Sequence, residues 1–301
     1  MKKSKKSYTT FLGIEKKYAD FKTAKFVIIL LPFEKTTSFQ KGTKNGPYKL
    51  LEASYQVELF DEELLFEPYK VGIATKTFLY QKNVPVEGYL KKVEEYTYTH
   101  ILSYNKIPIA VGGEHTVSIP LIASIKRKYS DLSVLHLDAH SDLRNEYENS
   151  PFNHACAARR WSELGVNTVQ LGIRNISKEE YDFYLHNKDI LHIFFAREIL
   201  NEFNPEKILQ YLKDNVYITI DLDGFDISVI RGTGTPEPGG LLWYPTLKIL
   251  EYIIKNRNVV GFDIMELMPL GEEKISEFVA AKLCYKLIAY YTYHKQLPLI
   301  Q

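Results

Sequence analysis

The chain has 301 residues and a mass of 34.9 kDa, with hydrophobic and charged fractions of 45% and 25%. These ordinary globular values exclude an intrinsically disordered or fibrous protein. The 38 Lys and Arg residues nearly balance 37 Asp and Glu residues, and the net charge of +1 removes the electrostatic argument for a nucleic-acid or membrane partner. Two cysteines make no disulfide framework, so we expect a reducing, cytoplasmic compartment.

The N-terminus is basic, but the apolar segment of a signal peptide does not follow it, because charged residues interrupt residues 7–25. The most apolar run, FVIILLPF at residues 26–33, is far too short to cross a bilayer. The sequence contains no repeat, no Gly/Ser linker and no break in composition. We therefore predict a single domain over residues 1–301, with residues 1–10 as a mobile tail.

Taken in chain order, short apolar runs alternate with helical patterns. The apolar runs are rich in Val and Ile and nearly continuous, which is typical of strands buried on both faces. They cover residues 26–31, 107–111, 132–137, 168–173, 216–220 and 259–264. Helical patterns cover about residues 89–104, 116–129, 205–213 and 276–293. The alternation predicts an α/β fold in which a parallel sheet has helices on both sides.

Four of the predicted strands end in polar, mostly acidic residues. The strand at 107–111 leads into Gly-Gly-Glu and then His115, and the strand at 132–137 leads into Asp-Ala-His-Ser-Asp at 138–142. The two later strands lead into Asp221 and Asp223, and into Glu266. Because ligands of open parallel sheets bind beyond the carboxyl ends of the strands, we expect these side chains to form one site.

The spacing of these residues favours a metal centre. Alternate residues of an extended chain face the same side, so Asp138, His140 and Asp142 aim at one point, as do Asp221 and Asp223. Buried carboxylates need a countercharge, which divalent cations supply. With His115, the set is too large for one tetrahedral zinc and suits two ions, for which Mn²⁺ is the natural candidate. Water between two such ions becomes a source of hydroxide near neutral pH.

Each motif alone also has a structural interpretation. A single D-x-D after a strand is usually a turn, and Glu266 alone is an ordinary residue at a strand end. His136 lies at the end of a buried strand and is better interpreted as a core residue, or as support for a ligand, than as a ligand. Cys156 and Cys284 are better interpreted as packing residues than as nucleophiles.

Together these segments resemble the ureohydrolase (arginase/agmatinase) family, in the expected order over nearly the whole chain. The resemblance implies a three-layer α/β/α, arginase-like fold, two Mn²⁺ ions per chain and assembly into a homotrimer or homohexamer. The matching stretches are PFEKTTSFQKGTKNGPYKLLEAS at 32–54, VGGEHTVS at 111–118, LDAHSDLR at 137–144, LGIR at 171–174, ITIDLDGFD at 218–226, GTGTPEPGG at 232–240 and GFDIMELMP at 261–269.

Position by position, the resemblance assigns roles to residues of this chain. It implies that Glu266 holds the substrate guanidinium, that His154 shuttles protons, and that Asp142 both binds metal and orients the hydroxide. The implied metal ligands are His115, Asp138, His140, Asp142, Asp221 and Asp223.

The chain departs from the family pattern before Gly232, where prolines are usual. Ile227 follows Asp226, and Ile230 and Arg231 precede Gly232, so we expect a looser loop. Arg231 also places a cation near a site meant for a cationic substrate. Glu114 stands where Asp or Asn is also common, and in the alternation it points away from the metals, which predicts a tolerant position.

The loop after D-x-H-x-D indicates the kind of guanidine substrate. Its pattern L-R-x-E-Y-E, followed by x-H-A-C-x-x-R-R, resembles that of agmatinases, and Glu146 and Glu148 suit a substrate with a distal amine. Alternatively, the two glutamates only solvate the loop. Agmatine, hydrolysed to putrescine and urea in polyamine biosynthesis, is our first expectation, and N1-aminopropylagmatine, hydrolysed to spermidine and urea, is the second. Arginase and guanidinobutyrase rank lower.

Two other classes of protein stay open at this point. One is a non-catalytic, polyamine-binding relative, which the loss of an aspartate ligand would favour. The other is a deacetylase-like amide hydrolase, which would hold a single zinc with fewer aspartates. In either case the bulk charge of +1 hides a predicted acidic well of six carboxylates at one sheet edge: Asp138, Asp142, Asp221, Asp223, Asp226 and Glu266.

Overall fold

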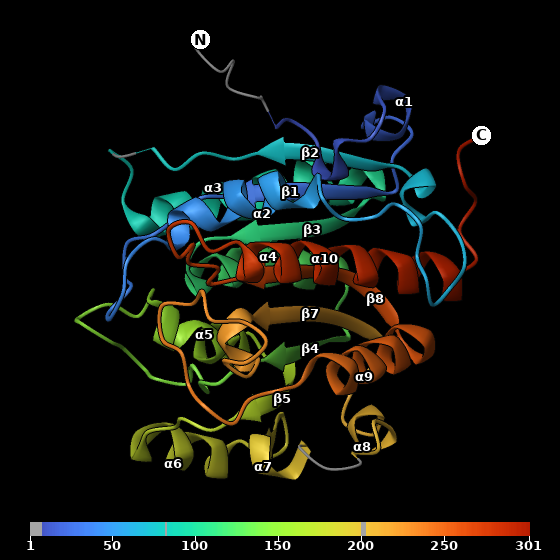
Figure 1. The fold of residues 1–301 in the computed structure, drawn as a ribbon. Coiled ribbons are helices and arrows are strands. Elements are labelled where there is room, and N and C mark those ends of the chain that lie inside the picture. The colour runs from blue at the N-terminus through green and yellow to red at the C-terminus, as the bar shows by residue number, and fades with distance from the viewer. Residues whose placement is uncertain (1–7, 82, 200–202) are drawn as a thin grey trace.

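A computed structural model describes residues 8–81, 83–199 and 203–301. Its centre is one sheet of eight strands, in which all paired strands run parallel in the order β2-β1-β3-β8-β7-β4-β5-β6 (Figure 1). The strands are β1 Phe26–Leu31, β2 Ile73–Thr77, β3 Ile107–Gly112, β4 Leu132–Leu137, β5 Asn167–Ile173, β6 Leu191–Phe195, β7 Asn215–Asp221 and β8 Asn258–Met265.

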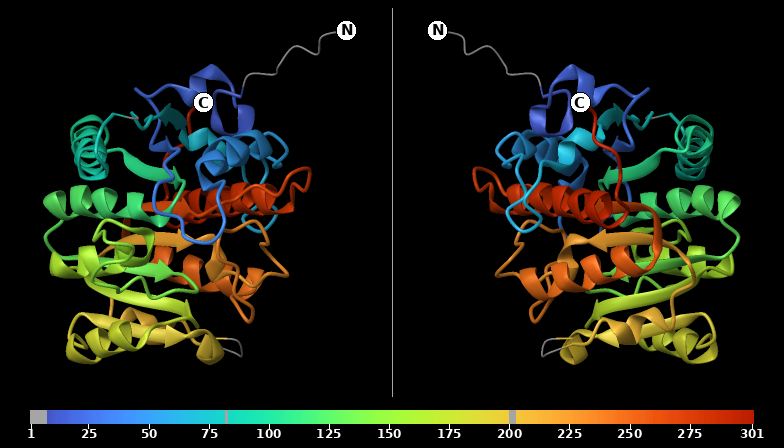
Figure 2. Two further views of the ribbon diagram at one scale, coloured as in Figure 1. Left: turned by 90° about the vertical axis from the view of Figure 1, so that its left-hand side faces the viewer. Right: turned by 90° about the vertical axis from the view of Figure 1, so that its right-hand side faces the viewer.

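Helices cover both faces of the sheet, which gives the predicted three layers (Figure 2). Apolar side chains of α2, α9 and α10 bury one face, and those of α3, α4 and α5 bury the other. The helices are α1 Lys16–Ala19, α2 Gly46–Ser54, α3 Val86–His100, α4 Ser118–Lys128, α5 Ala157–Glu163, α6 Lys178–His186, α7 Ala196–Ile199, α8 Glu206–Leu209, α9 Trp243–Asn256 and α10 Ile275–His294.

All six predicted strands are present, within one residue of their expected bounds at each end. Two further strands, β2 and β6, were not predicted, and they form the two edges of the sheet. Each of them pairs on one side only and is partly exposed, so neither has the continuous apolar run that marks the six inner strands. Edge position therefore explains both omissions.

The helix predicted over residues 205–213 is wrong in length, because α8 ends at Leu209. The guanidinium of Arg257 donates hydrogen bonds to the backbone carbonyls of Leu209 (2.7 Å) and Leu212 (3.2 Å). The Leu209 carbonyl also accepts the backbone N–H of Leu212 at 3.2 Å, so the chain closes in a turn here and does not continue the α-helical ladder. Helix α9 was not predicted either. Its first turn contains Pro245, a place where a helix tolerates proline.

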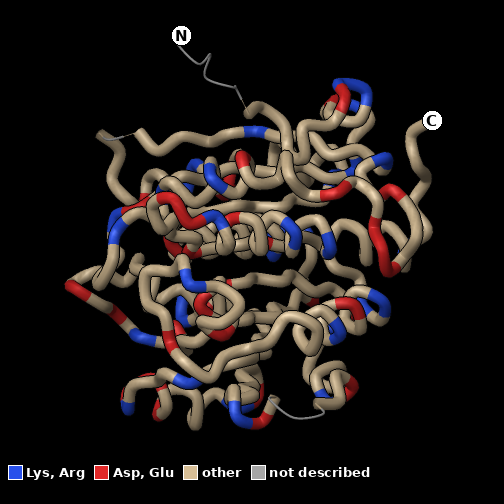
Figure 3. Tube along the Cα trace, viewed as in Figure 1, with Lys and Arg blue, Asp and Glu red and all other residues tan. Residues whose placement is uncertain are grey.

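The described part of the predicted tail, residues 8–10, lies against the body of the protein. The ring of Tyr8 packs on the ring of Tyr55, and the backbone N–H of Thr9 donates to the Tyr55 hydroxyl. Residues 1–7 lie outside the described residues. Within the described part of the chain, helices long and apolar enough to span a membrane are absent. Basic and acidic residues are interspersed along the trace (Figure 3).

Candidate active site

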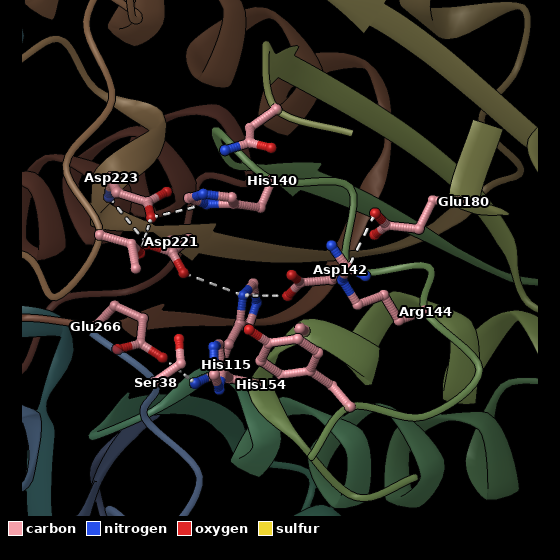
Figure 4. A pocket seen from close by; sticks show the side chains of 14 residues that line it. Ser38, His115, His140, Asp142, Arg144, His154, Glu180, Asp221, Asp223 and Glu266 are labelled. Carbon is pink, nitrogen blue, oxygen red and sulfur yellow. Dashed lines mark hydrogen bonds and ion pairs between the residues drawn. The ribbon is translucent and has the colours of Figure 1, made fainter. Parts of the chain in front are cut away.

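The strands that carry the predicted site residues are direct neighbours in the sheet, in the order β3-β8-β7-β4. Because these strands are parallel, their carboxyl ends meet at one edge. A cavity of about 190 Å³ opens there (Figure 4). Its wall includes seven of the residues singled out in the sequence: His115, His140, Asp142, His154, Asp221, Asp223 and Glu266.

His115 lies at the centre of an aspartate cluster. Its Nδ1 lies 3.2 Å from a carboxylate oxygen of Asp138 and 3.3 Å from oxygens of Asp142 and Asp221. Figure 4 shows Asp142 and Asp221 approaching this imidazole from opposite sides. Although the imidazole is 1% exposed, its Nδ1 has no hydrogen-bond partner among the described residues. A buried nitrogen without a partner, facing three carboxylates, is a typical ligand atom for a cation.

The second part of the cluster forms between β4 and β7. The Nδ1 of His140 lies 3.1 Å from Asp223 and 3.6 Å from Asp138. The Asp221 carboxylate accepts the backbone N–H of Asp223 at 2.9 Å, which folds the turn after β7 tightly. Asp223 in turn accepts the hydroxyl of Thr235 at 2.9 Å. Asp138 thus stands between the His115 group and the His140 group, and can serve both.

His136 lies close enough to join the cluster, but its hydrogen bonds place it behind Asp138. The side-chain amide of Gln170 donates one hydrogen to the backbone carbonyl of Ser141 (2.7 Å). The same nitrogen lies 2.9 Å from Nδ1 of His136, so Nδ1 accepts its second hydrogen. The Nε2 of His136 then donates to Asp138 at 2.7 Å. Both ring nitrogens are occupied, so His136 orients a carboxylate.

Asp142 and Glu266 are held in a left-handed backbone conformation, with φ of 53° and 63°. The expectation that residues 138–142 simply continue as extended chain is therefore wrong at Asp142. Glu180 fixes this turn, because its carboxylate accepts the Ser141 hydroxyl (2.7 Å) and the backbone N–H of Leu143 (3.0 Å). Such strained conformations of non-glycine residues concentrate at functional sites.

Burial and neighbouring carboxylates disfavour the charged forms of Asp142 and Asp221, whereas the surrounding imidazoles of His136, His115 and His140 outweigh burial at Asp138 and lower its pKa well below its ordinary value. Burial, with Asp138 nearby, raises the pKa of Asp142 to about 7. Burial, together with Asp223 and Asp138, raises the pKa of Asp221 well above its ordinary value. Burial lowers the pKa of His115, but its aspartate partners outweigh this and raise it well above the ordinary value. A divalent cation relieves this repulsion, so the His/Asp cluster fits a binuclear metal site.

Glu266 and His154 border the cluster on the β3 side. Glu266 is 6% exposed and accepts the backbone N–H of His115 at 2.7 Å. Burial, with Glu114 nearby, raises the pKa of Glu266 well above its ordinary value. His154 follows Asn153, whose side chain caps a short 3-10 turn. Burial and the neighbouring His140 lower the pKa of His154 to about 4, which keeps its imidazole neutral.

Other predicted residues lie outside the cavity wall. Glu146 and Glu148 are exposed, while Tyr147 between them lines the cavity. Asp226 is not part of the acidic well, because its carboxylate accepts the backbone N–H groups of Gly239 (2.9 Å) and Gly240 (3.1 Å). The expected acidic well therefore contains five of the six carboxylates.

The loop that includes Gly232 is anchored at Arg231 and Gly232 despite its missing prolines. The hydroxyl of Ser276 accepts the backbone N–H groups of Arg231 (3.1 Å) and Gly232 (2.8 Å). The Arg231 side chain is exposed and does not line the cavity. The expectation that Arg231 places a cation near the substrate is therefore wrong. Ile230 is 1% exposed and belongs to the core, whereas Ile227 is on the surface.

Several cavity residues escaped the sequence analysis. Glu180 carried only the signal of a helix cap, since Ser177 and Glu180 form a capping box at the start of α6. Thr235 lies within the GTGTPEPGG stretch, where its role as a donor to Asp223 could have been considered. The remaining wall residues without a predicted role are Ser38, Arg144, Tyr147, Ala155 and Asn175. All except Asn175 lie within the stretches quoted above, which gave no sign that these side chains face the cavity.

Comparison with known proteins agrees with this geometry. The sequence model of the Arginase family matches residues 24–289. The chain is 40% identical to an N(1)-aminopropylagmatine ureohydrolase of Synechocystis sp., covering 91% of this chain and 90% of that protein. It is 33% identical to an agmatinase of Pyrococcus horikoshii, with coverage of 94% and 97%.

Among solved structures, the agmatine ureohydrolase of Thermoplasma volcanium superposes with a TM-score of 0.85 at 27% identity, over 97% of each chain. The eight-stranded parallel sheet with helices on both faces is thus the arginase-like fold that the sequence motifs implied. The chain therefore belongs to the arginase family and is a ureohydrolase, a hydrolase that acts on linear amidines.

Proposed function

We propose that this ureohydrolase converts N1-aminopropylagmatine to spermidine and urea, with agmatine as the second candidate substrate. The observation that carries this order is the 40% identity to an aminopropylagmatine ureohydrolase over nine-tenths of both chains. It reverses the order expected from the loop motif, which placed agmatine first. The agmatinase at 33% identity keeps agmatine as a substrate to be tested.

We further propose that the cluster holds two Mn²⁺ ions, a choice supported by its mixture of carboxylate oxygens and imidazole nitrogens. The residues that would hold the ions are His115, Asp138, His140, Asp142, Asp221 and Asp223. Asp142 lies beside His115 in one part of the cluster, and Asp223 lies beside His140 in the other. When bound, such ions supply Lewis acidity, which makes water a competent nucleophile near neutral pH.

Around that centre, Glu266 would hold the guanidinium by charge-assisted hydrogen bonds and present its carbon to the attacking water. Asp142, which faces the cluster, would take a proton from this water. Asp142 would then pass this proton to the alkyl nitrogen as the bond from the guanidinium carbon to that nitrogen breaks, which releases urea and an amine. His154, a neutral imidazole on the cavity wall, would exchange the proton between the amine and solvent.

The distal end of the substrate would lie toward the loop after β4. Tyr147 and Arg144 line the cavity there, with the guanidinium of Arg144 stacked 5.0 Å from the Tyr147 ring. Glu146 and Glu148 are exposed on either side of Tyr147 and stay predicted contacts of a distal amine. Substitution of both by Gln tests this role without changing the shape of the loop.

The deciding experiment measures urea release from N1-aminopropylagmatine, agmatine, arginine and 4-guanidinobutyrate with the Mn²⁺-loaded protein. We expect the highest kcat/KM for N1-aminopropylagmatine. A preference for agmatine would reverse the proposed order, and release from arginine alone would refute it. In the Glu146→Gln/Glu148→Gln variant, KM for both amines should rise while kcat is retained.

The assembly and the compartment are part of the proposal. A homotrimer or homohexamer is expected from the family, and light scattering after size-exclusion chromatography measures it. A cytoplasmic location agrees with the two cysteines, Cys156 and Cys284, which are buried and free.

A further inference from the structure

Glu114, which the sequence analysis took for a tolerant position, is a fully buried carboxylate with four hydrogen-bond donors. One oxygen accepts the backbone N–H groups of Lys35 (2.5 Å) and Thr36 (2.7 Å). The other accepts the hydroxyls of Thr36 (2.8 Å) and Thr116 (2.7 Å). Four donors fill the lone-pair directions of a carboxylate, so Glu114 acts here as an acceptor only.

The Thr36 hydroxyl also contacts His154. Its oxygen lies 3.1 Å from the backbone nitrogen of His154 and 3.3 Å from the ring nitrogen Nδ1. A threonine hydroxyl has one hydrogen and two lone pairs. The Thr116 hydroxyl also lies 3.4 Å from this oxygen, but its own hydrogen is directed to Glu114 at the shorter distance of 2.7 Å. Since the Thr36 hydrogen is directed to Glu114 as well, the lone pairs of Thr36 are left for His154. The backbone N–H takes one of them, and Nδ1 can contact the other only as a donor.

From this hydrogen inventory we infer that Thr36 and Glu114 are positioning residues that fix His154 as the Nδ1–H tautomer, with the lone pair on Nε2. Nε2 makes no hydrogen bond to any residue that the structure describes, and His154 lines the cavity. The ring is therefore a preset proton acceptor on its cavity side. Its use in catalysis rests on the proposed function, whereas the tautomer does not.

The conservative substitution Glu114→Gln should invert this arrangement. Two backbone N–H groups donate to one carboxylate oxygen, so the Gln oxygen must take that place and its NH₂ group the other. The NH₂ group then donates to Thr36 and Thr116 and displaces the Thr36 hydroxyl hydrogen toward Nδ1 of His154. Nδ1 becomes the acceptor and the ring proton moves to Nε2.

The test is ¹⁵N NMR of the full-length, metal-free protein labelled at histidine, with His154→Asn used to assign the signals. We expect the Nδ1–H tautomer in the wild type and the Nε2–H tautomer in Glu114→Gln. Thr36→Ser keeps the hydroxyl and should keep Nδ1–H. Thr116→Val is the matched control, because it removes a donor to the same Glu114 oxygen without touching His154, and should also keep Nδ1–H.

With Mn²⁺ and substrate, Glu114→Gln should lower kcat for urea release at least about 10-fold, because Nε2 no longer accepts a proton. Thr36→Ser should keep most of the wild-type kcat. An Nε2–H signal in the wild type, or an unchanged tautomer in Glu114→Gln, would overturn the inference even if urea release is normal. Failure of every guanidine substrate with the expected tautomers would instead refute the proposed function.

Discussion

The hydroxyl of Thr219 lies 2.9 Å from Nε2 of His115, on the opposite side of the ring from the aspartate cluster. Its hydrogen is donated to the buried carboxylate of Asp263 at 2.6 Å. The Thr219 oxygen therefore accepts from Nε2–H, which leaves the Nδ1 lone pair free to bind a metal ion. A threonine bonded to a carboxylate thus sets the tautomer of His115, as Thr36 and Glu114 do for His154.

Removing this hydroxyl should weaken metal binding. In Thr219→Val, Nε2 loses its acceptor, and we expect Mn²⁺ affinity to fall about 10- to 100-fold. Calorimetric titration of the metal-free protein with Mn²⁺ measures the change. Thr219→Ser should bind almost as tightly as the wild type, and unchanged affinity in Thr219→Val would exclude this role of the hydroxyl.

Metal binding should stabilise the folded protein, because it relieves repulsion among buried carboxylates. A Mn²⁺ concentration of 100 Kd contributes about 2.7 kcal/mol per independent site, so the melting temperature of the metal-free protein should rise by several degrees. Differential scanning calorimetry measures this shift. Asp221→Asn should reduce the shift and abolish urea release, whereas the surface control Asp182→Asn should retain both. Full activity of Asp221→Asn without bound metal would contradict the proposed mechanism.

Glu266→Gln should impair binding and turnover together, because a neutral amide cannot pair with a guanidinium. Hydrogen bonds to charged groups contribute about 1.5–3 kcal/mol, so kcat/KM should fall about 10- to 100-fold. Steady-state urea release measures it at saturating Mn²⁺. Calorimetry must find the metal affinity of this variant unchanged, since a loss of metal would explain the same defect without a substrate contact.

Arg174 connects two loops at the metal site. Its guanidinium donates hydrogen bonds to the backbone carbonyl of Asp223 (2.6 Å), in the turn after β7, and to that of Glu237 (2.8 Å), in the loop that follows Gly232. Lysine lacks the planar fork, so Arg174→Lys should cost at least about 2 kcal/mol of stability and weaken Mn²⁺ binding. Arg257→Lys is a matched control, since Arg257 also donates to backbone carbonyls, away from the cavity. The Arg257→Lys variant should lose stability but keep the Mn²⁺ affinity of the wild type. Urea denaturation measures the stability, and titration with Mn²⁺ measures the affinity.

Lys286 is 1% exposed on α10 and contacts the carboxylates of Asp61 (3.0 Å) and Glu63 (2.8 Å). Lys286→Met leaves these acids uncompensated and should cost about 3–5 kcal/mol at neutral pH. Burial opposes ionisation of Glu63, but its hydrogen bonds with Lys286 and Tyr290 outweigh this and lower its pKa below the ordinary 4.5. The stabilisation is therefore present above that pH and lost as the pH falls further below it.

Urea denaturation at pH 7 and pH 3.5 measures the free energy of unfolding of the wild type and of Lys286→Met. The difference between the two proteins should be smaller at the lower pH. Lys282→Met is the control, because Lys282 pairs with Glu62, whose side chain is 59% exposed. That pair should contribute at most about 1 kcal/mol. A Lys286→Met penalty that does not depend on pH would point to lost packing instead of lost ion pairing.

The inner strands and the polar residues at their ends were predictable because their signals are local. A strand buried on both faces needs a continuous apolar run, and the strands that carry the site are central in the sheet. Gly113, in contrast, is required by a contact with a distant part of the chain, since a Cβ at this position would lie 1.9 Å from the carbonyl oxygen of Phe33. The edge strands β2 and β6 lacked such a signal.

The wrong expectations concern contacts between residues far apart in the chain. Glu114 was taken as tolerant because its partners Lys35 and Thr36 lie 79 and 78 residues away. Asp226 resembles a site aspartate in sequence, yet its carboxylate accepts hydrogen bonds from the backbone N–H groups of Gly239 and Gly240. Local pattern indicates which residues can do chemistry, but not which of them are used to hold loops.

By itself, the sequence determined the kind of chemistry, because the residue types of D-x-H-x-D and D-x-D suit a cation wherever they meet. Only the tertiary structure decided how those residues are oriented. The order β3-β8-β7-β4 brings His115 and the aspartates to one edge, and packing then fixes backbone conformations, hydrogen-bond partners and imidazole tautomers. These depend on where each hydrogen points, which is set by neighbours that the chain brings together only when it folds.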